Sequence, residues 1–146
     1  MTIAYFKSRC LVCWKGFEVP LLPDSSYGDN VYYDKTAKTF SYFSWFDNKE
    51  IENCLTDFLS KNPKLQFTND DTKGNTARQI VGLMANGDKE CVLGYNRCPR
   101  CGLKFNSVSD TRTEIKEIET LNFTNFLNLD NNARQQYLLD RTKNGL

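Results

Sequence analysis

The feature that most constrains this chain is the presence of two C-x-x-C pairs in a sequence without histidine. The first pair is Cys10 and Cys13, and the second is Cys98 and Cys101. In a reducing compartment, paired cysteines are more often metal ligands or redox groups than disulfides. Four thiolates complete the tetrahedral shell that a structural zinc ion prefers. The sequence therefore predicts one structural zinc ion bound by these four cysteines.

The second pair lies in a characteristic turn sequence. Cys98-Pro99-Arg100-Cys101-Gly102 resembles the C-P-x-C-G knuckle of zinc ribbons and rubredoxin-like domains. Proline fixes φ within such a turn, and glycine tolerates the left-handed conformation that often follows it. The resemblance implies that knuckles at 9–15 and 97–103 bind one ion between two β-hairpins. It covers only these segments, and Trp14 stands where the family usually has glycine.

Other uses of the cysteines stay open. Iron needs the same four sulfurs, so a rubredoxin-like electron-transfer protein is a less favoured alternative to the zinc protein. Thiol redox chemistry of the thioredoxin kind places a C-x-x-C pair at a helix N-terminus, whereas Cys98 and Cys101 lie in an expected hairpin. The pairs would otherwise be ordinary buried or surface thiols. Cys54 and Cys91 lie in apolar segments, which is typical of small buried hydrophobes.

The length and composition fit a single domain spanning 1–146. A chain with 40% hydrophobic and 13% aromatic residues can bury a core. Because 84 residues separate the two pairs, we expect an α+β fold in which zinc-ribbon-like β-hairpins carry a long α/β insertion at about 20–88. A C-terminal extension at 106–146, which includes a helix, follows the second knuckle.

Hydrophobic periodicity predicts three helices. A capping-box pattern at Asp47 and Glu50 starts the first helix, which should end near Asn62. The second helix should run from about residue 75 to 87. The third is expected over 131–145, capped by Asn131 or Asn132.

Strands are predicted from aromatic and β-branched residues. Those at 31–33 and 39–46 indicate a β-hairpin with both faces covered. Residues 113–123 fit either element and favour a strand. Shorter strands are expected at 65–67, 90–95 and 103–105.

The composition also excludes several kinds of enzyme. Without histidine there can be no His-dependent catalytic triad, His-ligated catalytic zinc or His proton shuttle. A closed four-thiolate shell leaves no position for water or substrate. Phosphate-binding glycine loops and the nucleophile-elbow motif are missing from the sequence. No catalytic residue is predicted, and we expect a binding module rather than an enzyme.

Two sets of residues are candidates for contacting a partner. Tyr42, Trp45 and Trp14 belong to the residue types enriched at interface hot spots, although most aromatic residues of a small domain form its core. Arg97 and Arg100 flank the second knuckle, where they could contact phosphates or simply offset the negative charge of a four-thiolate zinc centre. The net charge is only +1. We therefore expect a protein partner, with nucleic acid as the alternative.

The expected role is that of an adaptor, a regulator or an inhibitor such as an immunity-type protein. The first residues contain no apolar stretch typical of a signal peptide, and no window approaches the ~20 apolar residues of a transmembrane helix. We expect a cytoplasmic protein without a membrane partner. The sequence does not indicate an oligomeric state.

Overall fold

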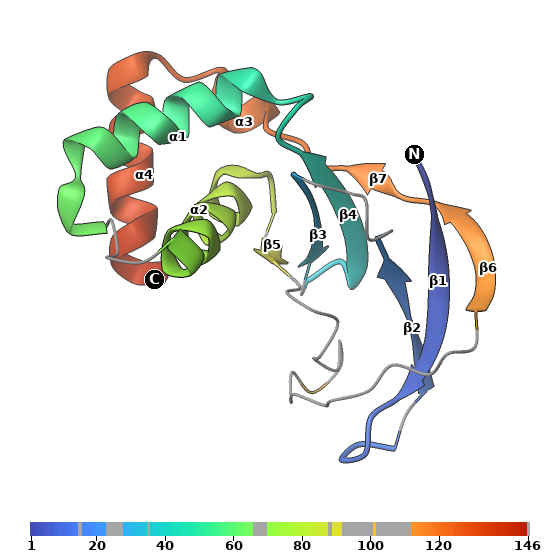
Figure 1. Ribbon diagram of the computed structural model, residues 1–146. Helices are drawn as coiled ribbons and strands as arrows, with labels where there is room; N and C mark the ends of the chain where they lie inside the picture. Colours follow the sequence, from blue (N-terminus) through green and yellow to red (C-terminus); the bar gives the residue numbers. More distant parts are fainter. Residues whose placement is uncertain are drawn as a thin grey trace.

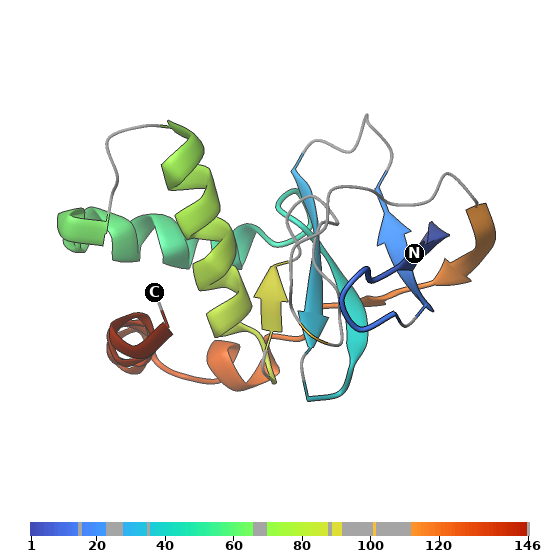
Figure 2. The ribbon, with the colours of Figure 1, turned by 90° about the horizontal axis from the view of Figure 1, so that it is seen from below.

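The computed structural model describes residues 1–14, 16–22, 28–34, 36–65, 70–87, 89–91, 101 and 112–145. Its elements form three layers, in which helices cover one face of a four-stranded sheet and a three-stranded sheet lies on the other side (Figure 1). The same order of layers is seen from below (Figure 2). The expected α+β class is confirmed.

The three-stranded sheet has the order β2-β1-β6 and is antiparallel throughout. Its strands are β1 (Thr2–Arg9), β2 (Gly16–Leu21) and β6 (Arg112–Glu117). β1 and β2 form a hairpin that runs from the pair Ala4–Leu21 to the pair Arg9–Gly16. The first C-x-x-C pair therefore lies in the turn at the end of this hairpin.

The four-stranded sheet has the order β5-β3-β4-β7. It consists of β3 (Asp29–Asp34), β4 (Thr39–Ser44), β5 (Lys89–Cys91) and β7 (Glu119–Thr120). The expected aromatic hairpin is confirmed as β3 and β4, while β7 pairs with β4 in parallel.

The segment expected at 113–123 is extended and contributes to both sheets. β6 pairs with β1, and after Ile118 the chain continues as β7 in the other sheet. The backbone N–H of Ile118 donates a hydrogen bond of 2.9 Å to the carbonyl of Met1. The predicted strand is thus confirmed for 113–117 and 119–120, with a change of sheet between the two parts.

Both faces of the β3–β4 hairpin are covered, as predicted. One face contributes Tyr32 and Phe43 to a core shared with the helices. The other face contributes Val31, which packs with Ile3 and Ile118 in a smaller core between the two sheets. The hairpin therefore joins the two cores.

The helices are α1 (Lys49–Lys61), α2 (Asp70–Met84), the short α3 (Thr124–Leu127) and α4 (Asn131–Gly145). A 3₁₀ turn, η1 (Pro63–Leu65), follows α1. The tyrosine hydroxyl of Tyr32 donates a hydrogen bond of 2.7 Å to the carbonyl of Arg78, which fixes α2 to the sheet.

The ends of the first and last helices differ in detail from the predictions. The capping box is wrong, because the carboxylate of Glu50 pairs with Arg134 at 3.1 Å and the helix begins after Asn48, whose amide donates to the carbonyl of Ser44. The last helix begins at Asn131, but the capping group is the carboxylate of Asp130, which accepts a hydrogen bond of 2.8 Å from a backbone N–H in the first turn.

The boundaries of the middle segment also differ. α2 begins at Asp70 rather than near residue 75. The strand expected at 65–67 is wrong at Leu65, whose N–H bonds to the carbonyl of Asn62 in the 3₁₀ turn that Pro63 starts. Residues 66–67 and 103–105 lie outside the described residues. Of the strand expected at 90–95, the structure describes residues 90–91, which belong to β5, and residues 92–95 lie outside the described residues.

Replacing Gly87 by alanine is expected to destabilise the protein. Gly87 has φ +91°, and an added Cβ would lie 2.7 Å from Oδ2 of Asp34. That carboxylate is buried and forms an ion pair with Lys89 at 3.0 Å. It also accepts hydrogen bonds from two backbone N–H groups of the β3–β4 turn. We expect a loss of about 1–3 kcal/mol in the free energy of unfolding, measured by urea denaturation. A loss below about 0.5 kcal/mol would contradict this arrangement.

Candidate metal centre

The turn between β1 and β2 brings the sulfurs of Cys10 and Cys13 to one side. The backbone N–H of Trp14 donates to the carbonyl of Cys10 at 2.9 Å, which closes the turn. The backbone N–H of Cys13 points to Sγ of Cys10 at 3.5 Å. This is the arrangement that the two-residue spacing predicts, because a tight turn allows two sulfurs to approach one ion.

Cys101 joins this pair from a distant part of the chain. Its Sγ lies 3.5 Å from Sγ of Cys10, although the two residues are 91 positions apart. The sulfur atoms of Cys10, Cys13 and Cys101 all lie within 4.8 Å of one another. Sulfurs that share a tetrahedral zinc ion at about 2.3 Å are separated by about 3.8 Å, whereas a disulfide needs about 2.05 Å. The three thiols are spaced for a shared metal ion.

The local environment stabilises the thiolate form of Cys10. The backbone N–H groups of Cys13 and Val12 lower the pKa of the Cys10 thiol to about 6, and the neighbouring cysteines add to this effect against the opposing effect of burial. Cys10 is 1% exposed. Because the thiolate is the form that binds metals, Cys10 is prepared for coordination near neutral pH.

The described residues contain three of the four expected ligands. Cys98 lies outside the described residues, and so do Arg97 and Arg100. The group of Cys10, Cys13 and Cys101 can therefore be described as a site that could bind a metal ion, without assigning the metal. The pair in the β1–β2 turn also lies in a β-hairpin rather than at a helix N-terminus, where thioredoxin-like redox pairs are found.

The two single cysteines lie elsewhere. Cys54 is half-buried on α1, packs against the helical core and accepts a hydrogen bond of 3.4 Å from Nη1 of Arg134. Cys91 ends β5 opposite Tyr32. Cys54 thus behaves mainly as the small core residue that the sequence predicts.

The three aromatic candidates for partner binding differ in exposure. Tyr42 is half-buried against the core between the sheets, and burial raises the pKa of its hydroxyl. Trp45 packs against the helical core, where its ring meets that of Phe43 at 4.9 Å between centroids. Trp14, in contrast, is 69% exposed. Among the three, Trp14 is the side chain that is most available for contact.

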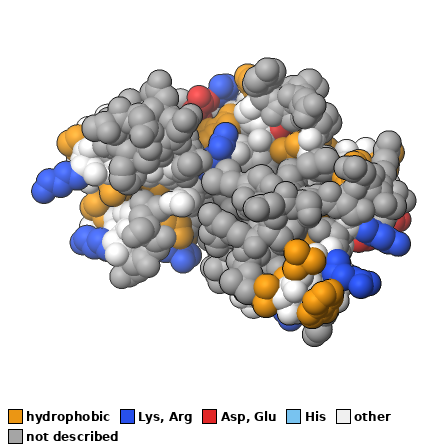
Figure 3. Space-filling view, turned by 60° about the horizontal axis from the view of Figure 1, so that its bottom comes forward, with side chains coloured by type: hydrophobic (Ala, Val, Ile, Leu, Met, Phe, Trp, Pro, Cys, Tyr) orange, Lys and Arg blue, Asp and Glu red, His pale blue; other side chains and the backbone are white. Residues whose placement is uncertain are grey.

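Two exposed neighbours of Trp14 were not among the predicted site residues. Leu11 is 69% exposed and Val12 is 62% exposed, between the two cysteines of the turn. The β1–β2 turn lies at the bottom of Figure 1 and comes forward in Figure 3, where hydrophobic side chains gather beside basic ones. The spacing could have indicated this exposure, because residues between two inward-facing cysteines lie on the outside of the turn.

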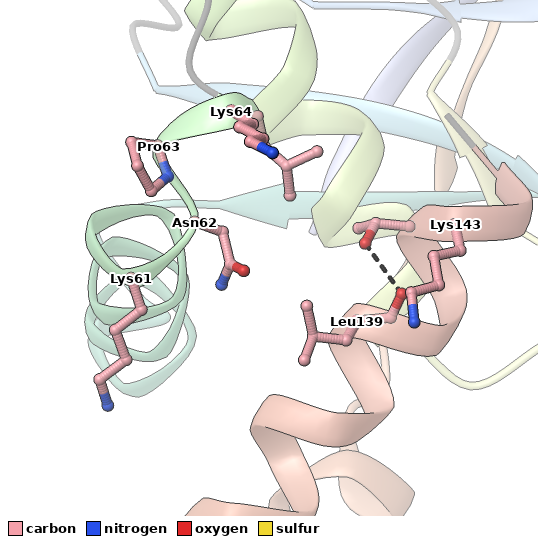
Figure 4. Close-up of a pocket in the computed structure, with 8 residues that line it drawn as sticks. Lys61, Asn62, Pro63, Lys64, Leu139 and Lys143 are labelled. Carbon is pink, nitrogen blue, oxygen red and sulfur yellow. Dashed lines mark hydrogen bonds between the residues drawn. The ribbon is translucent and has the colours of Figure 1, made fainter.

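A separate pocket of about 390 Å³ lies where the end of α1, η1 and α4 meet (Figure 4). Lys64 and Lys143 lie at its edges, and Leu139 contributes to its apolar wall. Two polar groups of its lining are already engaged, because Lys61 pairs with Asp57 at 2.8 Å and Thr142 donates to the carbonyl of Leu139 at 3.2 Å. The described residues of this lining include no thiol or carboxylate, so they offer no metal ligands of the kind found in the turn.

Comparisons with protein-family models, with curated proteins and with solved structures found no match for this chain. In the part of the chain that is described, no helix has both the length and the apolar character needed to cross a membrane.

Proposed function

We propose that the protein is a non-catalytic binding module whose scaffold is fixed by one structural zinc ion, bound by Cys10, Cys13, Cys98 and Cys101. The observation that supports this proposal is the convergence of three thiols from two distant segments. The donor set suits zinc, because sulfur ligands and a tetrahedral arrangement are typical of its structural sites. A closed shell of four thiolates would leave the ion without an open position for catalysis.

The metal would stabilise the part of the molecule that has the smallest core. Buried apolar residues are concentrated between the helices and the four-stranded sheet. Near the β1–β2 turn, the described apolar contacts are limited to Cys10, Cys13 and Phe17. A zinc ion would crosslink this turn to the segment around Cys101, and its binding free energy would then contribute directly to folding.

The proposed partner is a protein, bound by a cytoplasmic adaptor, regulator or immunity-type inhibitor. Exposed apolar side chains in the cysteine turn support a protein contact, because neighbouring exposed apolar side chains are typical of protein interaction sites. The net charge of +1 also favours a protein over a phosphate backbone.

Cobalt substitution tests the coordination directly. The protein prepared with cobalt(II) in place of zinc should show the visible absorbance of a tetrahedral thiolate complex. Cys101→Ser should lose this absorbance, whereas Cys54→Ser, which changes a cysteine on α1, should retain it. Cobalt bound without thiolate absorbance, or bound equally well by Cys101→Ser, would contradict the proposal.

Nucleic-acid binding is the second candidate, because Lys7 and Arg9 are exposed on the strand that leads into the turn with Trp14. We expect no binding to single-stranded or duplex oligonucleotides at low salt. Binding that falls steeply with salt and is lost in the double variant Lys7→Ala, Arg9→Ala would instead establish this alternative.

A further inference from the structure

The backbone of Trp14 adopts a conformation that is unfavourable for its side chain. Trp14 has φ +58°, in the left-handed region where bulky residues are rare and glycine is preferred. Trp14 occupies the position after the second cysteine of the turn. Burial of the indole ring does not offset this backbone strain, because the side chain is 69% exposed. An unfavourable conformation retained at an exposed residue is a reason to look for a function there.

Trp14 is part of a larger exposed surface, the apolar tip, which consists of Leu11, Val12 and Trp14. All three side chains are more than half exposed. Lys7 and Arg9 are also exposed and lie on the same face of β1, next to the tip. Glu18 lies opposite Lys7 on β2, but its carboxylate pairs with Lys116. The tip is therefore an apolar protrusion next to two exposed basic side chains.

We propose that the apolar tip inserts into an apolar pocket of a partner protein whose rim carries carboxylates. This inference rests on the proposed function and adds to it the surface and the chemistry of the partner. Trp14 would be the central side chain, because tryptophan is the residue type most often found at interface hot spots. Lys7 and Arg9 would pair with the acidic rim and accelerate association.

The observations favour a protein pocket over a lipid surface or a nucleic acid. Anionic lipid headgroups attract clusters of several basic side chains, whereas among the described residues only Lys7 and Arg9 stand next to the tip on β1, and Glu18 of β2 lies opposite Lys7. Leu11 and Val12 have no π-face, so they cannot stack on bases as aromatic side chains do. A protein pocket, in contrast, favours apolar side chains on a turn whose backbone is already held, because less conformational entropy is lost on binding.

The backbone of the tip is held in place by hydrogen bonds within the β1–β2 turn. The hydrogen bond from Trp14 N–H to the carbonyl of Cys10 closes the turn, and the bond from Cys13 N–H to Sγ of Cys10 links it to the cysteine centre. A metal ion bound there would restrict the turn further. The backbone that carries the three side chains would thus be pre-organised before a partner arrives.

The test uses the zinc-loaded full chain with the photoreactive amino acid p-benzoylphenylalanine in place of Leu11. A control carries the same group in place of Phe46, which is 67% exposed but lies in the turn between β4 and α1. After irradiation in cells that make the protein, we expect a protein adduct from position 11 that is not formed from position 46. The crosslinked segment of the partner should contain Asp or Glu residues beside apolar ones.

Binding is then measured with the purified partner and two glycine variants. Trp14→Gly should weaken binding about tenfold or more, while its melting temperature stays at or above that of the wild type because the left-handed strain is relieved. Lys38→Gly is the matched control, since Lys38 also has a positive φ of 56° but lies in the β3–β4 turn. It should bind as the wild type does, and binding by the wild type should weaken as salt rises.

Several results would overturn the inference. These are adducts from position 11 with lipid, nucleic acid or a second copy of the chain, the absence of any adduct, and unchanged binding by Trp14→Gly. The zinc content of the wild type distinguishes a failure of the tip proposal from a failure of the proposed zinc centre. A wild type with one zinc ion but without tip contacts overturns only the tip, whereas a wild type without zinc overturns the proposed zinc centre.

Discussion

Replacing Cys101 by serine is expected to abolish zinc binding at the proposed centre and to unfold the end of the molecule that carries the β1–β2 hairpin. Cys101 is the described residue that links the turn to a distant segment, through a sulfur 3.5 Å from that of Cys10. Structural zinc sites in small domains have apparent binding free energies of about 10–16 kcal/mol, which is comparable to the whole free energy of unfolding of a typical domain. The loss cannot be compensated by the few apolar contacts near the turn.

The measurement is the zinc content of the purified variant together with its thermal unfolding curve. We expect less than one tenth of a zinc ion per chain, as an order-of-magnitude estimate, and a transition that is broadened or shifted downward. Cys54→Ser is the matched control, because Cys54 lies on α1 and contacts Arg134 instead of the cysteine centre. Full zinc content and wild-type unfolding of Cys101→Ser would show that Cys101 is not a ligand.

Phe43→Ala is expected to have the second largest effect, a loss of about 3–5 kcal/mol in the free energy of unfolding. The ring is 1% exposed and contacts three other aromatic rings edge-on. Its centroid lies 4.9 Å from that of Trp45, 5.8 Å from that of Phe123 and 6.3 Å from that of Tyr32. Removing it leaves a cavity where β3, β4 and the segment before α3 meet.

Phe46→Ala is the control for this substitution. Phe46 lies three residues later and is 67% exposed, so its loss should change the free energy of unfolding by no more than about 0.5 kcal/mol. Urea denaturation of both variants measures the difference. Equal destabilisation by the two substitutions would contradict the burial described for Phe43.

The sequence predicts the aromatic hairpin because alternation is a local signal. Phe43 faces the helices while Tyr42 faces the other sheet, and each face leaves its own apolar pattern in the strand. The change of sheet at Ile118 could not be predicted, because the residue pattern of a strand does not show which other strands it pairs with. The predicted capping box of α1 is wrong for a related reason. Glu50 and Asn48 bond to Arg134 and Ser44, and neither partner can be read from the capping pattern.

The candidate site was predicted in part. Cys10, Cys13 and Cys101 could be chosen from spacing, because the C-x-x-C pattern specifies a turn and a ligand type together. Exposure was harder to predict, since Trp14, Tyr42 and Trp45 are chemically similar and only the packing around them separates them. The positive φ of Trp14 could be suspected only from the glycine that the knuckle family has at that position.

Metal analysis combined with thiol titration tests the central claim most directly. The protein is purified under reducing conditions, its metals are measured, and its reactive thiols are counted before and after chelation. The zinc centre predicts one zinc ion per chain and four additional thiols that react only after chelation, those of Cys10, Cys13, Cys98 and Cys101. Iron in place of zinc would indicate electron transfer, and a protein without metal whose six thiols all react would contradict the metal centre.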